Sequence, residues 1–89
     1  MVSPFFVLFV LKGKDNLKVG VVASKKIGKS VLRNKAKRRL REIVRLSQHN
    51  IPKNIWLVLV ARHGILTVNF ERAKNLFVAL VNDAVKKNQ

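Results

Sequence analysis

Cationic side chains gather in one segment of the sequence, from Lys25 to Arg45. The segment holds ten of the 19 Lys and Arg residues but only one acid, Glu42. Guanidinium groups pair bidentately with phosphate oxygens, and ammonium groups attract them as point charges. The chemistry available to these residue types is therefore the binding of a polyanion. The ten cations are Lys25, Lys26, Lys29, Arg33, Lys35, Lys37, Arg38, Arg39, Arg41 and Arg45.

The spacing of these residues predicts an amphipathic helix from Val31 to about Ser47. At about 100° per residue, apolar side chains fall on one face and cationic ones on the other. The apolar face comprises Leu32, Ala36, Leu40, Ile43 and Leu46, and the cationic face comprises Arg33, Asn34, Lys37, Arg38, Arg41 and Arg45. Lys35 and Arg39 lie at the borders, where their stems can cover apolar surface. Like charges three and four residues apart destabilise a helix, so this stripe favours phosphate contact over a merely solvated face.

The acids and histidines form no recognisable catalytic set. The four carboxylates, which are scattered without pairing, are Asp15, Glu42, Glu71 and Asp83. A protein phosphodiesterase would need a cluster of acids to hold metal ions. His49 and His63 fall in separate predicted loops with no acid nearby in sequence, so we interpret them as ordinary loop residues. We therefore expect no catalytic residue and no metal site on the chain.

Two predicted strands precede the basic helix. Phe5 to Lys12 is apolar, β-branched and aromatic, and Leu17 to Ser24 is rich in valine. The turn-forming residues Gly13, Lys14, Asp15 and Asn16 separate them, which favours an antiparallel hairpin. A basic loop, Lys25 to Lys29, follows, and Ser30 is placed to cap the helix.

A third strand and a second helix complete the predicted order. Ile55 to Ala61 is apolar on both faces, which predicts a central strand covered on both sides or nearly so. Trp56 is accordingly interpreted as a core residue. The last helix is predicted from about Phe70 to Lys86, with Thr67 or Asn69 as its cap.

The bulk composition limits the partner to a few classes. The 89 residues indicate one domain, and the net charge of +15 favours RNA, DNA or an anionic membrane as partner. The longest apolar run, Phe5 to Leu11, is far shorter than the ~20 residues of a membrane span, and Lys12 and Lys14 follow it rather than precede it as in a signal peptide. We therefore expect a cytoplasmic protein without a membrane partner. A ribosomal or general RNA-binding protein suits this composition too, and a DNA-binding or membrane-surface helix fits less well.

The order of residues in the basic segment resembles the signature of the bacterial ribonuclease P protein family. The positions of that pattern are filled by Lys26, Gly28, Lys29, Val31, Arg33, Asn34, Lys37, Arg38 and Arg41. The resemblance covers nearly the whole chain and implies a single domain, residues 1–89. It also implies an α/β (α+β) two-layer sandwich like domain 2 of ribosomal protein S5. That fold has a small mixed sheet, and its elements follow the chain in the order strand, strand, helix, strand, helix. Its βαβ crossover is left-handed, whereas general rules favour a right-handed one.

The resemblance further implies a function as the protein subunit of ribonuclease P. In this family the catalytic RNA performs the hydrolysis with Mg²⁺ and removes the 5′ leader of precursor tRNA, while the protein adds substrate affinity and neutralises phosphates. The expected form is a monomer in a 1:1 complex with the RNA. Together with the charge pattern, the resemblance assigns RNA binding to Lys25, Lys26, Lys29, Arg33, Asn34, Lys37, Arg38, Arg41 and Arg45.

The family also implies a cleft for the single-stranded leader on the open face of the sheet. Phe5, Val7 and Phe9 share one face of the first strand because side chains alternate along a strand. Phe9 matches a position that is often tyrosine in the family, so we assign it to the cleft as a stacking platform, with an ordinary core position as the alternative. Family members usually begin with a basic helix that forms one wall of this cleft, whereas this sequence begins almost at the first strand.

Overall fold

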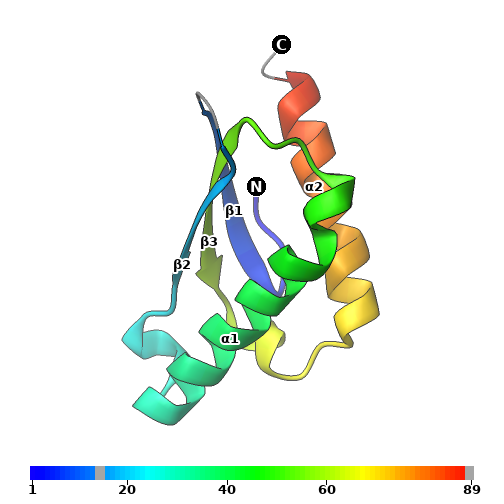
Figure 1. Ribbon diagram of the computed structural model, residues 1–89. Helices are drawn as coiled ribbons and strands as arrows, with labels where there is room; N and C mark the ends of the chain where they lie inside the picture. The colour runs from blue at the N-terminus through cyan, green and yellow to red at the C-terminus, as the bar shows by residue number, and fades with distance from the viewer. Residues whose placement is uncertain (14–15, 88–89) are drawn as a thin grey trace.

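Three strands form a mixed sheet in the order β1-β3-β2 (Figure 1). The computed structural model describes residues 1–13 and 16–87 of the chain. β1 spans Phe6–Lys12, β2 spans Lys18–Val22 and β3 spans Ile55–Ala61. β3 pairs with β1 in the antiparallel sense and with β2 in the parallel sense. The predicted central position of β3 and its predicted bounds are confirmed.

The predicted hairpin between the first two strands is wrong. β1 and β2 run in opposite directions, but β3 lies between them and takes the hydrogen bonds of both. β3 is the strand with apolar residues on both faces, whereas β2 contains Gly20 and is exposed along most of its length. The apolar strand therefore holds the central position and β2 an edge. Lys14 and Asp15, which belong to the predicted turn, lie outside the described residues.

Two long helices lie together on one face of the sheet (Figure 1). α1 spans Ser30–Ser47 and α2 spans Phe70–Lys87, close to the predicted ranges. Short 3₁₀ turns precede or follow them: η1 at Lys25–Ile27, η2 at Gln48–Asn50 and η3 at His63–Leu66.

The two predicted helix caps have different outcomes. Asn69 caps α2, because its side-chain oxygen accepts hydrogen bonds from the backbone N–H groups of Glu71 at 2.8 Å and Arg72 at 3.3 Å. Ser30 is not a cap: it is the first residue of α1, and its hydroxyl accepts a hydrogen bond from the Arg33 guanidinium at 3.0 Å.

The core lies between the sheet and the two helices. Phe6 and Leu8 of β1 and Leu57 and Leu59 of β3 are fully buried on the helix side. Phe6 meets Phe77 of α2 edge to face, with ring centroids 6.2 Å apart. The prediction that β3 is covered on both sides is wrong, because both helices pack on the same face and leave the opposite face open.

The connection from β2 through α1 to β3 is left-handed. In Figure 1 both strands run downward, α1 passes in front of the sheet, and the chain moves from β2 on the left to β3 on its right. The handedness implied by the family resemblance is therefore correct, against the general preference for right-handed crossovers. The crossover places α1 beside the edge strand β2, where its outer side faces solvent.

Candidate nucleic-acid interface

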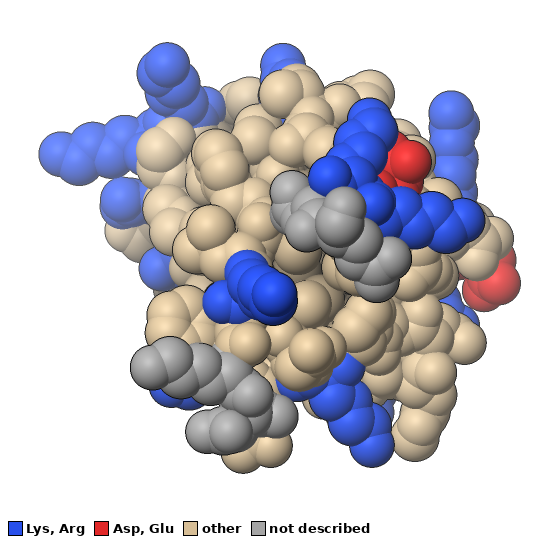
Figure 2. All heavy atoms as spheres, turned by 90° about the horizontal axis from the view of Figure 1, so that it is seen from above, with Lys and Arg blue, Asp and Glu red and all other residues tan. Residues whose placement is uncertain are grey.

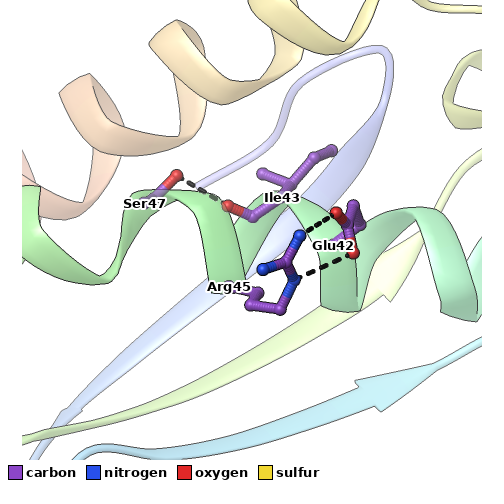
Figure 3. A network of polar contacts seen from close by, with 4 residues as sticks. All are labelled: Glu42, Ile43, Arg45 and Ser47. Carbon is purple, nitrogen blue, oxygen red and sulfur yellow. Dashed lines mark hydrogen bonds and ion pairs between the residues drawn. The ribbon is translucent and has the colours of Figure 1, made fainter.

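α1 separates a buried face from a charged face, as its sequence predicts. Ala36, Leu40 and Ile43 are buried against the sheet and α2. The prediction fails at both ends of the apolar face: Leu32 and Leu46 are exposed, and Val44 and Ser47 are buried in addition. The buried hydroxyl of Ser47 is satisfied because it donates to the carbonyl oxygen of Ile43 at 2.6 Å (Figure 3).

The opposite side of α1 carries the cationic stripe. Asn34, Arg38, Arg41 and Arg45 are exposed, and Arg33 and Lys37 are half-buried. Among the described residues, Arg45 is the only cation of this set in an ion pair with a carboxylate. The stripe therefore presents several uncompensated charges to solvent, and this favours a polyanion as ligand.

Glu42 and Arg45 form the single acid–base pair within the stripe (Figure 3). Arg45 Nε donates to one carboxylate oxygen of Glu42 at 3.1 Å, and Arg45 Nη2 donates to the other. This forked hydrogen bond lowers the pKa of the Glu42 carboxyl below its usual value and raises the pKa of Arg45. Arg45 is thus partly neutralised, unlike Arg38 and Arg41.

The basic loop before α1 is anchored at two points. The Ser24 hydroxyl accepts a hydrogen bond from the backbone N–H of Lys26 at 3.3 Å, and His63 Nε2 lies 2.8 Å from the Lys26 carbonyl oxygen. Ile27 is buried, so its neighbours are turned outward. Lys25, Lys26 and Lys29 are exposed next to the N-terminal end of α1 and extend the cationic surface beyond the helix.

The open face of the sheet is a second surface, and it is apolar. The strand register places three rows of side chains on it: Val7, Val60 and Val22; Phe9, Val58 and Gly20; Leu11, Trp56 and Lys18. Phe9 is 51% exposed while Phe6 and Leu8 are buried, so the predicted alternation along β1 is correct. A side chain at Gly20 would meet nothing within 4 Å, so the β2 edge of this face is open at that position.

Trp56 and Phe5 do not lie where the sequence predicts them. Trp56 is not a core residue: it lies on the open face, 38% exposed, with the Lys18 ammonium 5.0 Å from its ring centroid. Its alternation with the buried Ile55 and Leu57 was visible in the sequence, but the uncovered face was not. Phe5 precedes β1 and lies beside Gly64, with the Arg72 guanidinium 5.8 Å from its ring. Val7 and Phe9 therefore lie together, and Phe5 is apart from them.

The family described as ribonuclease P matches residues 1–85 of the chain. The chain belongs to the ribonuclease P protein family. Similar curated members are the ribonuclease P protein components of Dictyoglomus turgidum, 31% identical over 80 residues, and Syntrophomonas wolfei, 38% identical over 78 residues. Each alignment covers 88% of this chain and about two thirds of the relative, 67% and 66% respectively.

Solved structures of ribonuclease P proteins share this fold. The protein from Thermotoga maritima is 30% identical with a TM-score of 0.77, over 91% of this chain and 78% of its own. The protein from Staphylococcus aureus is 26% identical with a TM-score of 0.72, over 97% of this chain and 79% of its own. The α/β fold implied by the residues from Lys26 to Arg41 is therefore confirmed, and the roles of individual site residues stay predictions.

The described residues include no membrane span and no metal cluster. Neither α1 nor α2 is long and apolar enough to cross a bilayer. Within residues 1–13 and 16–87, no three His, Cys, Asp or Glu side chains come together as metal ligands could.

Proposed function

We propose that this chain is the protein subunit of ribonuclease P and binds the catalytic RNA through the cationic side of α1 and the basic loop before it. Family membership supports the identity of the partner, and the nearly acid-free exposed stripe carries the assignment of the surface. Arg and Asn side chains on a helix suit contacts to phosphate and sugar. The proposed contacts, in a 1:1 complex, are Lys25, Lys26, Lys29, Arg33, Asn34, Lys37, Arg38, Arg41 and Arg45.

In this proposal the RNA performs the hydrolysis and holds the Mg²⁺ ions. The described carboxylates do not suit a metal site on the protein: Glu42 binds Arg45, Asp83 lies 3.4 Å from the ammonium of Lys87, and Glu71 stands in the first turn of α2. The protein contributes affinity for substrate and neutralises crowded phosphates. It is therefore an accessory subunit of the endonuclease and supplies no catalytic residue.

The open sheet face is the proposed site for the 5′ leader of precursor tRNA. Exposed Phe9 offers a ring on which an unpaired base can stack, with Val7 beside it on β1. Trp56 and Lys18 add a second ring and a cation at the same face. Such mixed aromatic and cationic surfaces bind single strands without sequence preference. Phe5, also predicted for the cleft, lies apart from Val7 and Phe9 beside Gly64 and is not part of the proposed stacking surface.

Replacing the Phe9 ring tests this leader site. We expect Phe9→Ala to weaken binding of a precursor with a leader by about 1–3 kcal/mol, the usual value of one stacked base, and to leave binding of leaderless tRNA unchanged. The affinity of each substrate for the reconstituted enzyme is the measurement. Leu46→Ala, at an exposed position on α1, is the control. An equal loss for both substrates would contradict a stacking role.

Reconstitution tests the function as a whole. The protein is added to a bacterial ribonuclease P RNA, and 5′ cleavage of precursor tRNA is followed at low Mg²⁺ concentration. We expect cleavage to accelerate when protein is added to the RNA, and no cleavage by the protein alone. A protein that leaves this RNA unaffected but recovers ribosomal RNA in a pull-down would instead be a general RNA-binding protein.

A further inference from the structure

Arg39, at the border of the predicted stripe, turns back into the protein. Its Nε donates to the carbonyl oxygen of Ile65 at 2.6 Å, and its Nη2 donates to the carbonyl oxygen of Val68. The guanidinium carbon lies 4.3 Å from the centroid of the Phe70 ring. All three partners belong to η3, to the start of α2 or to the link between them, so Arg39 joins α1 to a distant part of the chain.

These contacts need the shape of a guanidinium group and not only its charge. Two donors from one planar fork reach two carbonyl oxygens, and the same plane covers an aromatic ring. A lysine ammonium is a point charge on a flexible stem and cannot reproduce this arrangement. Arg39 is half-buried, whereas its neighbours Arg38 and Arg41 are exposed.

The rest of the packing of α1 is apolar. Ala36, Leu40 and Ile43 of α1 are buried in the same core cluster as Ala73 and Phe77 of α2. The N-terminal end of α1 extends past the core, with Val31 77% exposed. Apolar burial is non-directional, whereas hydrogen bonds require defined angles. Arg39, one turn after Ala36, therefore supplies a directional constraint near the middle of the stripe.

We propose that Arg39 is a positioning residue that fixes the rotation of α1 on the body of the protein, so that Arg38 and Arg41 reach RNA phosphates together. This inference rests on the proposed function of the stripe. In this proposal, Arg39 makes no phosphate contact of its own, since the Nε–Nη2 edge of its guanidinium is held by two backbone carbonyl oxygens. The number of phosphate contacts should then be independent of Arg39, while the affinity depends on it.

Charge-conserving substitutions separate positioning from direct contact. In binding to ribonuclease P RNA, Arg39→Lys is expected to lower the affinity by about tenfold, as for loss of one charge-assisted hydrogen bond, with an unchanged slope of log affinity against log salt. Arg62→Lys is the matched control and should keep the affinity, because Arg62 is an exposed arginine outside the proposed contacts. Arg39→Ala should leave the slope unchanged, whereas Arg38→Ala should reduce it by about one contact.

A double-mutant cycle distinguishes positioning from a merely structural role. If Arg39 acts through its neighbours, the effect of Arg39→Lys shrinks when Arg38 and Arg41 are both alanine, whereas independent effects add. Binding is measured at a temperature where circular dichroism shows every variant folded. Three results would each overturn the inference while the proposed function stands. They are a wild-type affinity for Arg39→Lys, losses that add in the cycle, and a salt slope that Arg39→Ala reduces. A wild-type protein that does not bind the RNA would overturn both.

Discussion

Glu42 reduces the positive charge of the cationic stripe by pairing with Arg45. It is the only acid between Lys25 and Arg45, and it holds Arg45 in a forked hydrogen bond on the exposed side of α1 (Figure 3). Because Arg45 lowers the pKa of Glu42, the pair persists below the usual carboxyl range and opens only as the pH falls through that lowered value. At neutral pH, Glu42 therefore competes with a phosphate for the Nε and Nη2 donors of Arg45.

Removing the charge of Glu42 should strengthen RNA binding. We expect Glu42→Gln to release Arg45, to raise the affinity for ribonuclease P RNA several-fold and to steepen its salt dependence by up to about one phosphate contact. Glu71→Gln adds the same net charge on α2 and frees no cation of the stripe, so it is the control for a general charge effect. Equal gains for the two variants would mean that only net charge matters.

The sequence predicts some residue positions well and others poorly. The alternation that puts Val7 and Phe9 on one face of β1 is correct, because alternation is a local property of a strand. Trp56 was misplaced because its exposure depends on where both helices pack. Arg39 was placed at the border of the stripe, but its partners Ile65 and Val68 lie 26 and 29 residues away, and no local pattern indicates such a contact.

At the scale of elements, local signals located each helix and strand but not the strand pairing. The bounds of β3 followed from its apolar run, and the start of α2 followed from Asn69. The prediction of a β1–β2 hairpin is wrong. The short turn favours pairing of neighbouring strands, but the apolar strand β3 lies between them and pairs along both of its edges. The left-handed path through α1 was available only from the family resemblance, since local sequence carries no sign of handedness.

The loop that joins η1 to α1 depends on Gly28. Its φ is +132°, and a β-carbon there would lie 2.9 Å from Leu32 Cδ1. We therefore expect Gly28→Ala to destabilise the protein by about 1–3 kcal/mol, as measured by urea denaturation. Gly20→Ala on β2 is the matched control, because its added carbon meets nothing within 4 Å, and it should be nearly neutral. Equal stability of the two variants would show that the backbone at Gly28 is not constrained.

At the scale of the whole molecule, the main feature is a large excess of positive charge. The chain carries 19 cationic and 4 acidic residues, and Figure 2 shows basic side chains projecting around the molecule with few acidic atoms among them. Within residues 1–13 and 16–87, two ion pairs offset this charge, Arg45 with Glu42 and Lys87 with Asp83. Self-repulsion therefore opposes the compact state.

Salt should stabilise the free protein. Screening shortens the range of repulsion from about 30 Å at 0.01 M to about 8 Å at 0.15 M ionic strength, so we expect the melting temperature to rise over that interval. Thermal unfolding followed by circular dichroism at several NaCl concentrations is the measurement. A melting temperature that is flat or falls with added salt would show that the cationic surface does not limit stability.

The most direct test of the cationic stripe is the salt dependence of its binding to ribonuclease P RNA. The side chains of Arg38 and Arg41 are exposed on α1, so replacing both with alanine should leave the fold intact. We predict that Arg38→Ala with Arg41→Ala weakens binding and reduces the slope of log affinity against log salt by about two phosphate contacts. An unchanged slope would contradict the claim that α1 binds the RNA through its phosphates.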